Sequence, residues 1–562
     1  MPDPYRTSSP LGGEGSDSPG APLTLQIASV HPAVRPDADT TTHAVVKIRA
    51  AKQPQGAKRP MLSAVLVLDV SGSMQGEPIA QVLRSAERLA EILDDTDRLG
   101  IVTFSDGAET RAPLEPLSRA RKEVARKLAG VSASGGTNIA GGLAQAALAF
   151  PKREVDERQL LVLMSDGEPN IGPSTPGELE AQARALRSRE LAVSSLGFGA
   201  HHHDDILHAI AQGGGGRYTF VPDAKLAESG FIRALGAQLD VVAERVELLL
   251  TPGPDVEIVR VLEDPPSAYG AAGLRVTLSD LAVGDELNLV VELRVRGPRE
   301  PGPLRALTAT LTAGLAGTKQ AFKTIEIAEI LATRNGSIES DPAAHALASI
   351  AQAVELRAKA RALSDRGSYA DAESLLRKAQ AIIQATPGFT PGDGTPLGDA
   401  NETLADEILV AQRRPARQEY EQYKRAARDY ADFGTSTASV RAGGKLTDMP
   451  PSTRALFDKA RAGMVLPKGY LRVLTGPRAG LRVAIANERF VIGRMGVADL
   501  SLPDPSVSRQ HAMIVLTGGS FWLVDMGSTS GCTHDGKRVT RLRLTDGIEI
   551  ELGTNRLRYE QE

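Results

Sequence analysis

The stretch LSAVLVLDVSGSM, residues 62–74, decides the fold of the first large unit of this 562-residue chain. Its apolar run does not alternate with polar residues, which is typical of a strand that is buried on both faces. Three further runs of this kind follow: RLGIVTF from Arg98, QLLVLMS from Gln159 and LAVSSLGFG from Leu191. Such strands form parallel sheets that helices cover on both sides.

Helical stretches separate these runs. In the first of them, apolar residues recur at helical spacing and form one stripe: Ile79, Val82, Leu83, Ala86, Leu89, Ala90 and Leu93. The alternation of strand and helix predicts a doubly wound α/β domain over residues 59–240.

The flanks of this domain predict antiparallel strands. Residues 21–58 contain PLTLQIASV and HAVVKIRA, and residues 241–332 contain further strand-like runs. One of these, ELNLVVELRV from Glu286, alternates in part, as a half-buried strand does. We therefore expect one β-sandwich with the α/β domain inserted between its strands.

The rest of the chain is expected to form a disordered tail (1–20), a helical region (339–432), a linker (433–468) and a small all-β domain (469–560). The helical region contains AKARALSDRGSYADAESLLRKAQAII, which resembles one tetratricopeptide-type helix pair that turns at Gly367. A single pair cannot bury its apolar face alone, so a helical spacer docked on neighbouring helices, including one around residues 401–430, is the alternative.

Composition narrows the classes of function. The net charge is −4 and the chain has one Trp, so it has neither the basic stripe nor the stacking platform of a nucleic-acid binder. Cys532 is the only cysteine, which excludes an intramolecular disulfide and favours a reducing compartment. Residues 1–20 lack the pattern of a secretion signal, and no run approaches the ~18 apolar residues of a membrane span. We expect a cytoplasmic protein.

Oxygen-bearing side chains follow the predicted strands. Asp69, Ser71 and Ser73 follow the first, Thr137 precedes a helix, and Asp166 closes the QLLVLMS run. Loops at the carboxyl ends of parallel strands meet at one edge of the sheet. Because carboxylates and hydroxyls suit hard cations, the pattern predicts a site for Mg²⁺, Mn²⁺ or Ca²⁺ and argues against zinc.

These five residues resemble the metal-ion-dependent adhesion site of von Willebrand factor A (VWA) domains, which has an Asp-x-Ser-x-Ser motif, a separate Thr and a separate Asp. The resemblance covers about residues 62–240. It implies that hydroxyls ligate the metal, that aspartates act partly through water, and that one open position binds an exposed Asp or Glu of a partner. An ion with few charged ligands stays under-neutralised and attracts such a carboxylate. No general base or nucleophile stands nearby, so we expect binding and no catalysis.

Two neighbouring features are ambiguous. The run His201-His202-His203-Asp204-Asp205 has zinc or nickel ligands, but its place between a strand and a helix favours a surface loop. The run Gly213–Gly216 is not followed by Lys-Ser/Thr and therefore predicts a helix-to-strand turn, not a phosphate-binding loop.

The C-terminal region carries three ordered motifs: RFVIGR ending at Arg494, VSRQHA from Val507 and DMGSTSG from Asp525. They resemble the Gly-Arg, Ser-x-x-His and Gly-Ser-Thr-Asn-Gly-like segments of forkhead-associated (FHA) domains over residues 469–559. The resemblance implies a reader of phosphothreonine. Its site residues would be Arg494, Ser508, Arg509, Thr529 and Ser530, with Gly493 and His511 in structural roles.

The donor chemistry agrees with these roles. Arg494 offers a planar fork to phosphate oxygens, Ser508 a short hydroxyl donor and Arg509 further positive charge. Thr529 would frame the pocket for the threonine methyl group.

Two positions depart from the family pattern. Ser530 and Asp535 stand where FHA domains usually have Asn. The change at Ser530 predicts a weaker grip on the peptide beyond the phosphate, without loss of the phosphate pocket.

Together the two sites predict a non-catalytic, bacterial-type signalling adaptor that binds a phosphothreonine protein and an acidic partner, with a Ser/Thr kinase upstream. A subunit that assists a separate AAA+ ATPase is the alternative, and an extracellular adhesin fits less well. We also consider that Thr435 or Thr437 of the linker, once phosphorylated, binds the chain's own FHA domain, since a tethered ligand has an effective concentration of order millimolar. Ser/Thr-rich linkers are common, which favours the view that this match is fortuitous.

Overall fold

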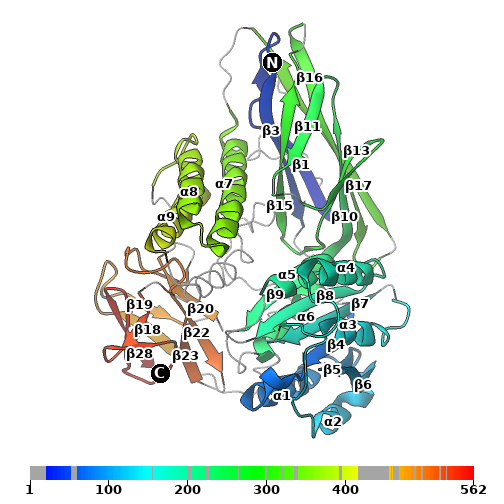
Figure 1. The fold of residues 1–562 in the computed structure, drawn as a ribbon, viewed down its shortest axis with the longest axis vertical. Coiled ribbons are helices and arrows are strands. Elements are labelled where there is room, and N and C mark those ends of the chain that lie inside the picture. Colours follow the sequence, from blue (N-terminus) through cyan, green and yellow to red (C-terminus); the bar gives the residue numbers. More distant parts are fainter. Residues whose placement is uncertain are drawn as a thin grey trace.

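The computed structural model describes residues 21–51, 60–154, 156–166, 168–198, 204–221, 227–263, 265–297, 300–318, 320–334, 340–391, 395–414, 455–456, 459, 468–485, 489–494, 498–517, 520–526, 528 and 530–562. The predicted tail, His201–His203, Thr435, Thr437 and Thr529 lie outside them. Figure 1 shows an elongated pair of sheets, an α/β unit, a group of helices and a second β-rich unit at the C-terminal end.

The α/β unit contains a six-stranded sheet in the order β6-β5-β4-β7-β8-β9, parallel except for β6. Its strands are β4 (Met61–Asp69), β5 (Arg98–Phe104), β6 (Ala108–Pro116), β7 (Glu157–Ser165), β8 (Ala192–Phe198) and β9 (Gly215–Val221). Its helices are η1 (Gly72–Met74), α1 (Glu77–Ile92), α2 (Leu117–Leu128), α3 (Ile139–Ala147), α4 (Pro176–Arg187), α5 (Asp204–Gly214) and α6 (Ala227–Leu239).

Helices cover both faces of this sheet because its central strands are apolar on both faces. Leu66 and Leu68 of β4 pack in one cluster with residues of α1, α2 and α6, and Val65 and Val67 pack in another with residues of α3, α4 and α5. The chain reverses its direction of growth between β4 and β7, which is where open α/β sheets bind ligands.

Two local details concern the sequence predictions. The glycines at 213 and 214 end α5 and those at 215 and 216 begin β9, so this run is the predicted helix-to-strand junction. The edge strand β6 was not predicted, because its residues other than Ala112 are half-buried or exposed and include polar side chains.

The elongated unit consists of two sheets around one apolar core. One has the order β1-β3-β15-β11, with β1 (Leu23–Ser29), β3 (Thr40–Ala50), β15 (Glu286–Val295) and β11 (Val256–Val261). The other has the order β12-β13-β10-β16-β17-β2 with β14 beside β10, made of β12 (Ser267–Gly270), β13 (Gly273–Thr277), β10 (Val241–Pro252), β16 (Gly302–Leu315), β17 (Ala321–Ala332), β2 (Ala33–Val34) and β14 (Leu281–Ala282). Strands from both sides of the α/β unit in sequence thus pair directly, from Thr40 with Val295 to Arg49 with Glu286.

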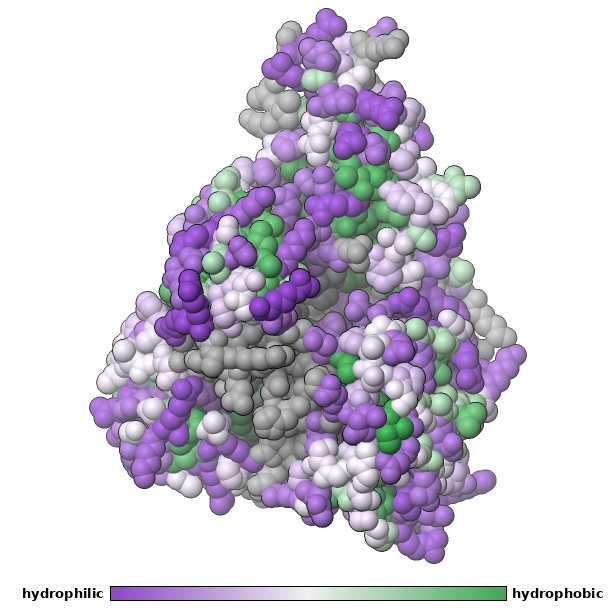
Figure 2. All heavy atoms as spheres, in the orientation of Figure 1, coloured by the Kyte–Doolittle hydropathy of each residue, from purple (hydrophilic) through white to green (hydrophobic). Residues whose placement is uncertain are grey.

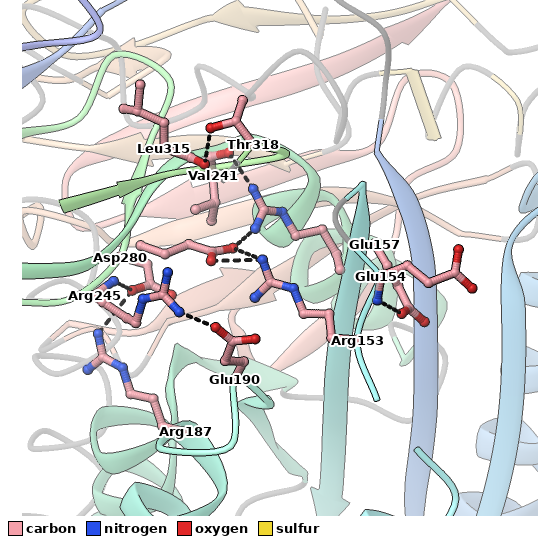
Figure 3. Close-up of polar contacts among 12 residues, drawn as sticks. Arg153, Glu154, Glu157, Arg187, Glu190, Val241, Arg245, Asp280, Leu315 and Thr318 are labelled. Carbon is pink, nitrogen blue, oxygen red and sulfur yellow. Dashed lines mark hydrogen bonds and ion pairs between the residues drawn. The ribbon is translucent and has the colours of Figure 1, made fainter. Parts of the chain in front are cut away.

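A polar junction connects the α/β unit to these sheets (Figure 3). Arg153 donates to both carboxylate oxygens of Glu244 at 3.1 and 2.9 Å, and Arg187 donates to Asp280 at 3.0 Å. Arg245 pairs with Glu190. The α/β residues of this junction lie near the amino ends of β7 and β8, at the end of the sheet opposite to the Asp69 loop.

Three helices follow: α7 (Pro342–Asp365), α8 (Tyr369–Gln384) and α9 (Pro396–Arg413). Asp341 and Thr395 cap α7 and α9 by accepting backbone N–H groups, and Gly367 adopts φ +78° at the turn between α7 and α8. Leu404 and Ile408 of α9 share an apolar cluster with α8. Small residues of α7 pack on the β1-β3-β15 sheet in a separate cluster that includes Ala344, Ala348 and Ala351.

The C-terminal unit is a second pair of sheets with its own core. The first has the order β19-β18-β28-β27-β24-β25, made of β19 (Arg482–Ala484), β18 (Gly469–Val473), β28 (Asn555–Gln561), β27 (Glu549–Leu552), β24 (Cys532–His534) and β25 (Lys537–Val539). The second has the order β21-β20-β22-β23-β26, made of β21 (Leu500–Ser501), β20 (Arg489–Gly493), β22 (Ala512–Thr517), β23 (Ser520–Asp525) and β26 (Arg541–Arg543).

The surface is mostly polar. Figure 2 shows a largely hydrophilic face on which hydrophobic residues form small, separate areas.

Leu456, within the predicted linker, is only 2% exposed and belongs to a cluster that joins α/β residues to Met513 and Val515 of β22. In the described part of the chain, no helix combines the length and apolar character needed to cross a membrane.

Candidate functional sites

The first candidate site begins where β4 ends. Asp69 is fully buried; its Oδ1 accepts the backbone N–H of Ser71 at 2.8 Å and its Oδ2 accepts the hydroxyl of Ser165 at 2.5 Å. Burial raises the pKa of this carboxyl to about 6, although hydrogen bonds from Ser165 and Ser71 lower it. Asp69 therefore fixes the shape of the Ser-Gly-Ser loop from beneath.

The hydroxyls above Asp69 form a short chain of oxygens. Ser71 Oγ and Ser73 Oγ lie 3.0 Å apart, and Ser73 Oγ donates to Asp166 Oδ1 at 2.7 Å. Ser71 is buried, Ser73 is exposed and Asp166 is half-buried, so these oxygens reach the surface at Ser73.

Thr137 lies on a loop that is bound directly to the Ser-Gly-Ser loop. The backbone N–H of Gly72 donates to the Gly135 carbonyl at 3.0 Å, and that of Ser134 donates to the Val70 carbonyl at 2.8 Å. Thr137 itself is 3% exposed and its N–H donates to Asn170 Oδ1 at 2.8 Å. All five predicted residues are therefore on connected loops at one edge of the sheet.

Two supporting residues were not predicted from the sequence. Asp106, after β5, accepts the Gly136 N–H at 2.6 Å, and Asn170 accepts the Thr137 N–H. Both orient the Thr137 loop by accepting its backbone N–H groups. The motif used for prediction contains only cation ligands, so it could not identify them. A search for polar residues after each predicted strand would have found Asp106.

The donor set fits a hard divalent cation. Hydroxyl and carboxylate oxygens converge within hydrogen-bond distance of each other, above the buried carboxyl of Asp69. A cation bound there would add positive charge beside these carboxylates.

The second candidate site lies at the end of β20. Gly493 cannot be replaced, because a Cβ there would lie 1.8 Å from the Arg509 carbonyl oxygen. The next residue, Arg494, receives backbone support as its N–H donates to the Ser508 carbonyl at 3.0 Å, and its Nε donates to the Val507 carbonyl at 3.3 Å. The predicted phosphate ligands Arg494 and Ser508 are thus adjacent.

His511 connects two loops beneath this site. Its Nδ1 is 3.1 Å from the backbone N of Ser508 and its Nε2 is 3.1 Å from the Gly531 carbonyl oxygen. Since Ser508 N–H is a donor, Nδ1 accepts and Nε2 carries the proton in the neutral ring. Burial lowers the pKa of His511, in agreement with a neutral imidazole.

The two departures from the family pattern have local explanations. The exposed Ser530 donates its hydroxyl to the Ser506 carbonyl at 2.8 Å, within the loops around the site. Asp535 and Gly536 have φ values of +49° and +72° in the tight turn between β24 and β25. Asp-Gly is a favoured pair in such hairpin turns, so Asp535 fits a structural position.

The arginines of this site also contact the helical segment. Arg494 Nη1 lies 3.3 Å from Glu402 Oε2 of α9, and Arg509, which is 8% exposed, donates to Thr403 Oγ1 of the same helix. Glu402 and Thr403 carry no motif and were not predicted.

Comparison with known proteins identifies both domains. Residues 64–231 match the von Willebrand factor type A domain, and residues 490–553 match the FHA domain. The chain therefore contains a VWA domain and a C-terminal FHA domain.

Similar proteins include the uncharacterized protein sll0103 of Synechocystis sp., 29% identical over 43% of this chain and 56% of its own length. Another is the E3 ubiquitin-protein ligase WAV3 of Arabidopsis thaliana, 26% identical over 58% of this chain and 43% of its own length. The chain thus spans about half the length of these curated relatives. A solved structure from a study of phosphothreonine-dependent FHA domain interactions is 29% identical, covers 17% of this chain and 97% of its own, and has a TM-score of 0.16.

Proposed function

We propose that this protein is a non-catalytic, cytoplasmic signalling adaptor. Its FHA domain binds a protein that a Ser/Thr kinase has phosphorylated on threonine, and its VWA domain binds an exposed Asp or Glu of a second protein through Mg²⁺ or a similar cation. We further propose that the two sheets beside the VWA domain are one β-sandwich into which that domain is inserted, and that α7 and α8 form a tetratricopeptide-like spacer.

The observation that carries the metal site is the chain of oxygens from Ser71 through Ser73 to Asp166, with separations of 3.0 and 2.7 Å. In the proposed state Ser71, Ser73 and Thr137 ligate the cation, and Asp69 and Asp166 act at least partly through water. The bound cation would supply positive charge for an incoming carboxylate. Ser73, in the middle of this series of oxygens, is exposed, so a partner can reach it.

The support for the phosphate site is its supply of donors. Arg494 and Arg509 are cationic, and the Ser508 hydroxyl is on the loop whose carbonyl receives the Arg494 N–H. Charge-assisted hydrogen bonds from such groups are the strong ones in phosphate recognition.

The proposal that the chain is not an enzyme is supported by the surroundings of His511, which uses both ring nitrogens in loop contacts.

An affinity pull-down with the full chain tests the adaptor. We expect two separable sets of partners, one lost when EDTA replaces Mg²⁺ and the other lost after phosphatase treatment of the lysate. Ser73→Ala should remove only the first set and Ser508→Ala only the second. Ser520→Ala on β23 is a matched control. If neither EDTA nor phosphatase changes what the wild type retains, the proposal is wrong.

A further inference from the structure

Helix α9 contacts the phosphate-binding arginines of the FHA domain. Glu402 forms an ion pair with Arg494 at 3.3 Å, and Thr403 accepts a hydrogen bond from Arg509. The side chains of Arg494 and Glu402 are 19% and 26% exposed, and Thr403 is 2% exposed. The contact is therefore a partly desolvated one in which ion pairs are weakly screened by salt.

These two residues present the chemistry that a phosphothreonine would present. A carboxylate offers two acceptor oxygens and one negative charge to an arginine fork, whereas a phosphate offers three oxygens and a charge of about −1.5 to −2. The Thr403 hydroxyl uses its proton on the Asp399 carbonyl at 2.7 Å, so its lone pairs remain as acceptors for Arg509. Glu402 and Thr403 are thus weaker anionic and polar substitutes for the ligand.

The position of α9 is fixed from its other side. Glu407 is buried and pairs with Arg357 at 2.8 Å and Arg361 at 2.7 Å on α7. Although burial raises the pKa of Glu407, these two arginines hold it far below its usual range. Since α7 packs on the sandwich, release of the FHA arginines requires the FHA domain to separate from α9, or α9 to leave α7.

We propose that Glu402 and Thr403 cover the phosphate site from within the same chain, so that a phosphothreonine protein must displace α9 to bind. This inference rests on the proposed function of the FHA domain. A ligand that binds only the open form has an apparent affinity reduced by the fraction of molecules that are open. The stronger charge of phosphate gives the partner the advantage over Glu402 once it is present. The α9 contact thus sets the concentration of phosphorylated partner above which the FHA domain binds it.

The test measures binding of a fluorescent phosphothreonine peptide pool with randomised flanks to the full chain. Glu402→Gln keeps the side-chain shape and removes the charge, and we expect the pool to bind about tenfold more tightly. Thr403→Val should give a smaller gain of roughly threefold. Glu123→Gln is the matched control, because Glu123 pairs with Arg126 on α2 of the α/β unit. It should leave the affinity unchanged.

Hydrogen exchange gives a second, ligand-free readout. Backbone amides of residues 494–511 should exchange faster in Glu402→Gln than in the wild type before any peptide is added. Measurable binding of equal affinity in the wild type and Glu402→Gln would overturn the inference and leave the proposed function standing. No binding of the pool by the wild type, Glu402→Gln or Thr403→Val would overturn both.

Discussion

The proposed metal site and the proposed phosphate site differ in where their polar neighbours come from. Ser73 contacts Ser71 and Asp166 of its own domain, and its loop is joined to the Thr137 loop by backbone hydrogen bonds. Arg494, in contrast, contacts Glu402, which is 92 residues earlier in the chain and belongs to another segment. A site built by adjacent loops is ready for its ligand when its domain folds, whereas the second site also depends on how the segments are arranged.

The largest expected effect concerns the internal support of the phosphate site. His511→Ala leaves the Ser508 N–H and the Gly531 carbonyl without their buried partner, at about 1–3 kcal/mol each. We expect the FHA domain to lose about 3 kcal/mol of stability. Trp522 on β23 is the only tryptophan of the chain, so its fluorescence in urea follows this domain and its contact with the cluster that contains Leu456 and α/β residues.

The control for this measurement is His534→Ala, whose ring is half-buried and contacts one backbone carbonyl. His534→Ala should lower the urea midpoint of the Trp522 transition by less than His511→Ala does. An unchanged Trp522 transition in His511→Ala would show that the imidazole does not support the site.

The second expected effect concerns the VWA domain. A cation at a hundred times its dissociation constant should stabilise the domain by about 2.7 kcal/mol. Ser73→Ala should reduce this gain, and Ser71→Ala combined with Asp166→Ala should abolish it. Scanning calorimetry with Mg²⁺, Mn²⁺ or EDTA measures it, with the exposed Ser118→Ala on α2 as control. If no divalent cation shifts the unfolding temperature of the VWA domain, that domain has no metal site to contrast with the phosphate site.

A third effect separates phosphate recognition from general peptide affinity. Arg494→Ala removes charge-assisted hydrogen bonds, and we expect a loss of about 2 kcal/mol, or roughly thirtyfold, in phosphothreonine-peptide binding. Affinity for the unphosphorylated peptide should not change. Arg482→Ala is the control, because Arg482 pairs with Glu560 and Glu562 at the far sheet of the domain. Fluorescence anisotropy in the Glu402→Gln background, which removes the ion pair between Glu402 and Arg494, is the measurement; equal affinities with and without Arg494→Ala would exclude Arg494 as a ligand.

The smallest effect is one of pH on the support of α7. His31, His43 and His345 lie at the contact between α7 and the β1-β3-β15-β11 sheet, and burial lowers the pKa of each; for His43, Glu292 opposes this shift and Arg260 adds to it. Their folded-state pKa values are below the ordinary 6.5, so the unfolded state binds more protons. The stabilisation that these neutral histidines contribute is complete above pH 6.5 and is lost as the pH falls below this value.

Hydrogen exchange of α7 at pH 7.5 and 5.5, corrected for intrinsic rates, tests this dependence. Protection should fall at the lower pH in the wild type, and less in His31→Gln combined with His345→Gln. The VWA strands serve as an internal reference. Equal loss of protection in wild type and variant would assign the effect to other groups.

The contrast between the sites also explains what the sequence predicted. Asp69, Ser71 and Ser73 share one turn, and Thr137 and Asp166 each follow from the rule that loops meet at one sheet edge, so local patterns placed the candidate metal ligands. The arginine and serine of the FHA motifs were found in the same way. Both domains are confirmed by their family matches.

Contacts between distant segments were not predictable in this way. Glu402 and Thr403 resemble any polar residues of an amphipathic helix, and nothing in one sequence indicates what such residues face. The edge strand β6 was missed for a related reason: it is paired on one side only, and its exposed polar residues hide its strand character. Metal binding, the identity of the metal and the partners remain proposals.

The pairing of β3 with β15 has a consequence for synthesis on the ribosome. Arg49 and Glu286, which bond across these strands, are 237 residues apart in sequence. At about 5–20 residues per second, β1 and β3 wait on the order of 10–50 s for the strand that completes their sheet. During this time the VWA domain can fold, since its parallel sheet is contained in residues 61–221. During this time the unpaired edge of β3 can pair with other chains and aggregate. We therefore expect chaperones to bind the nascent chain at this stage.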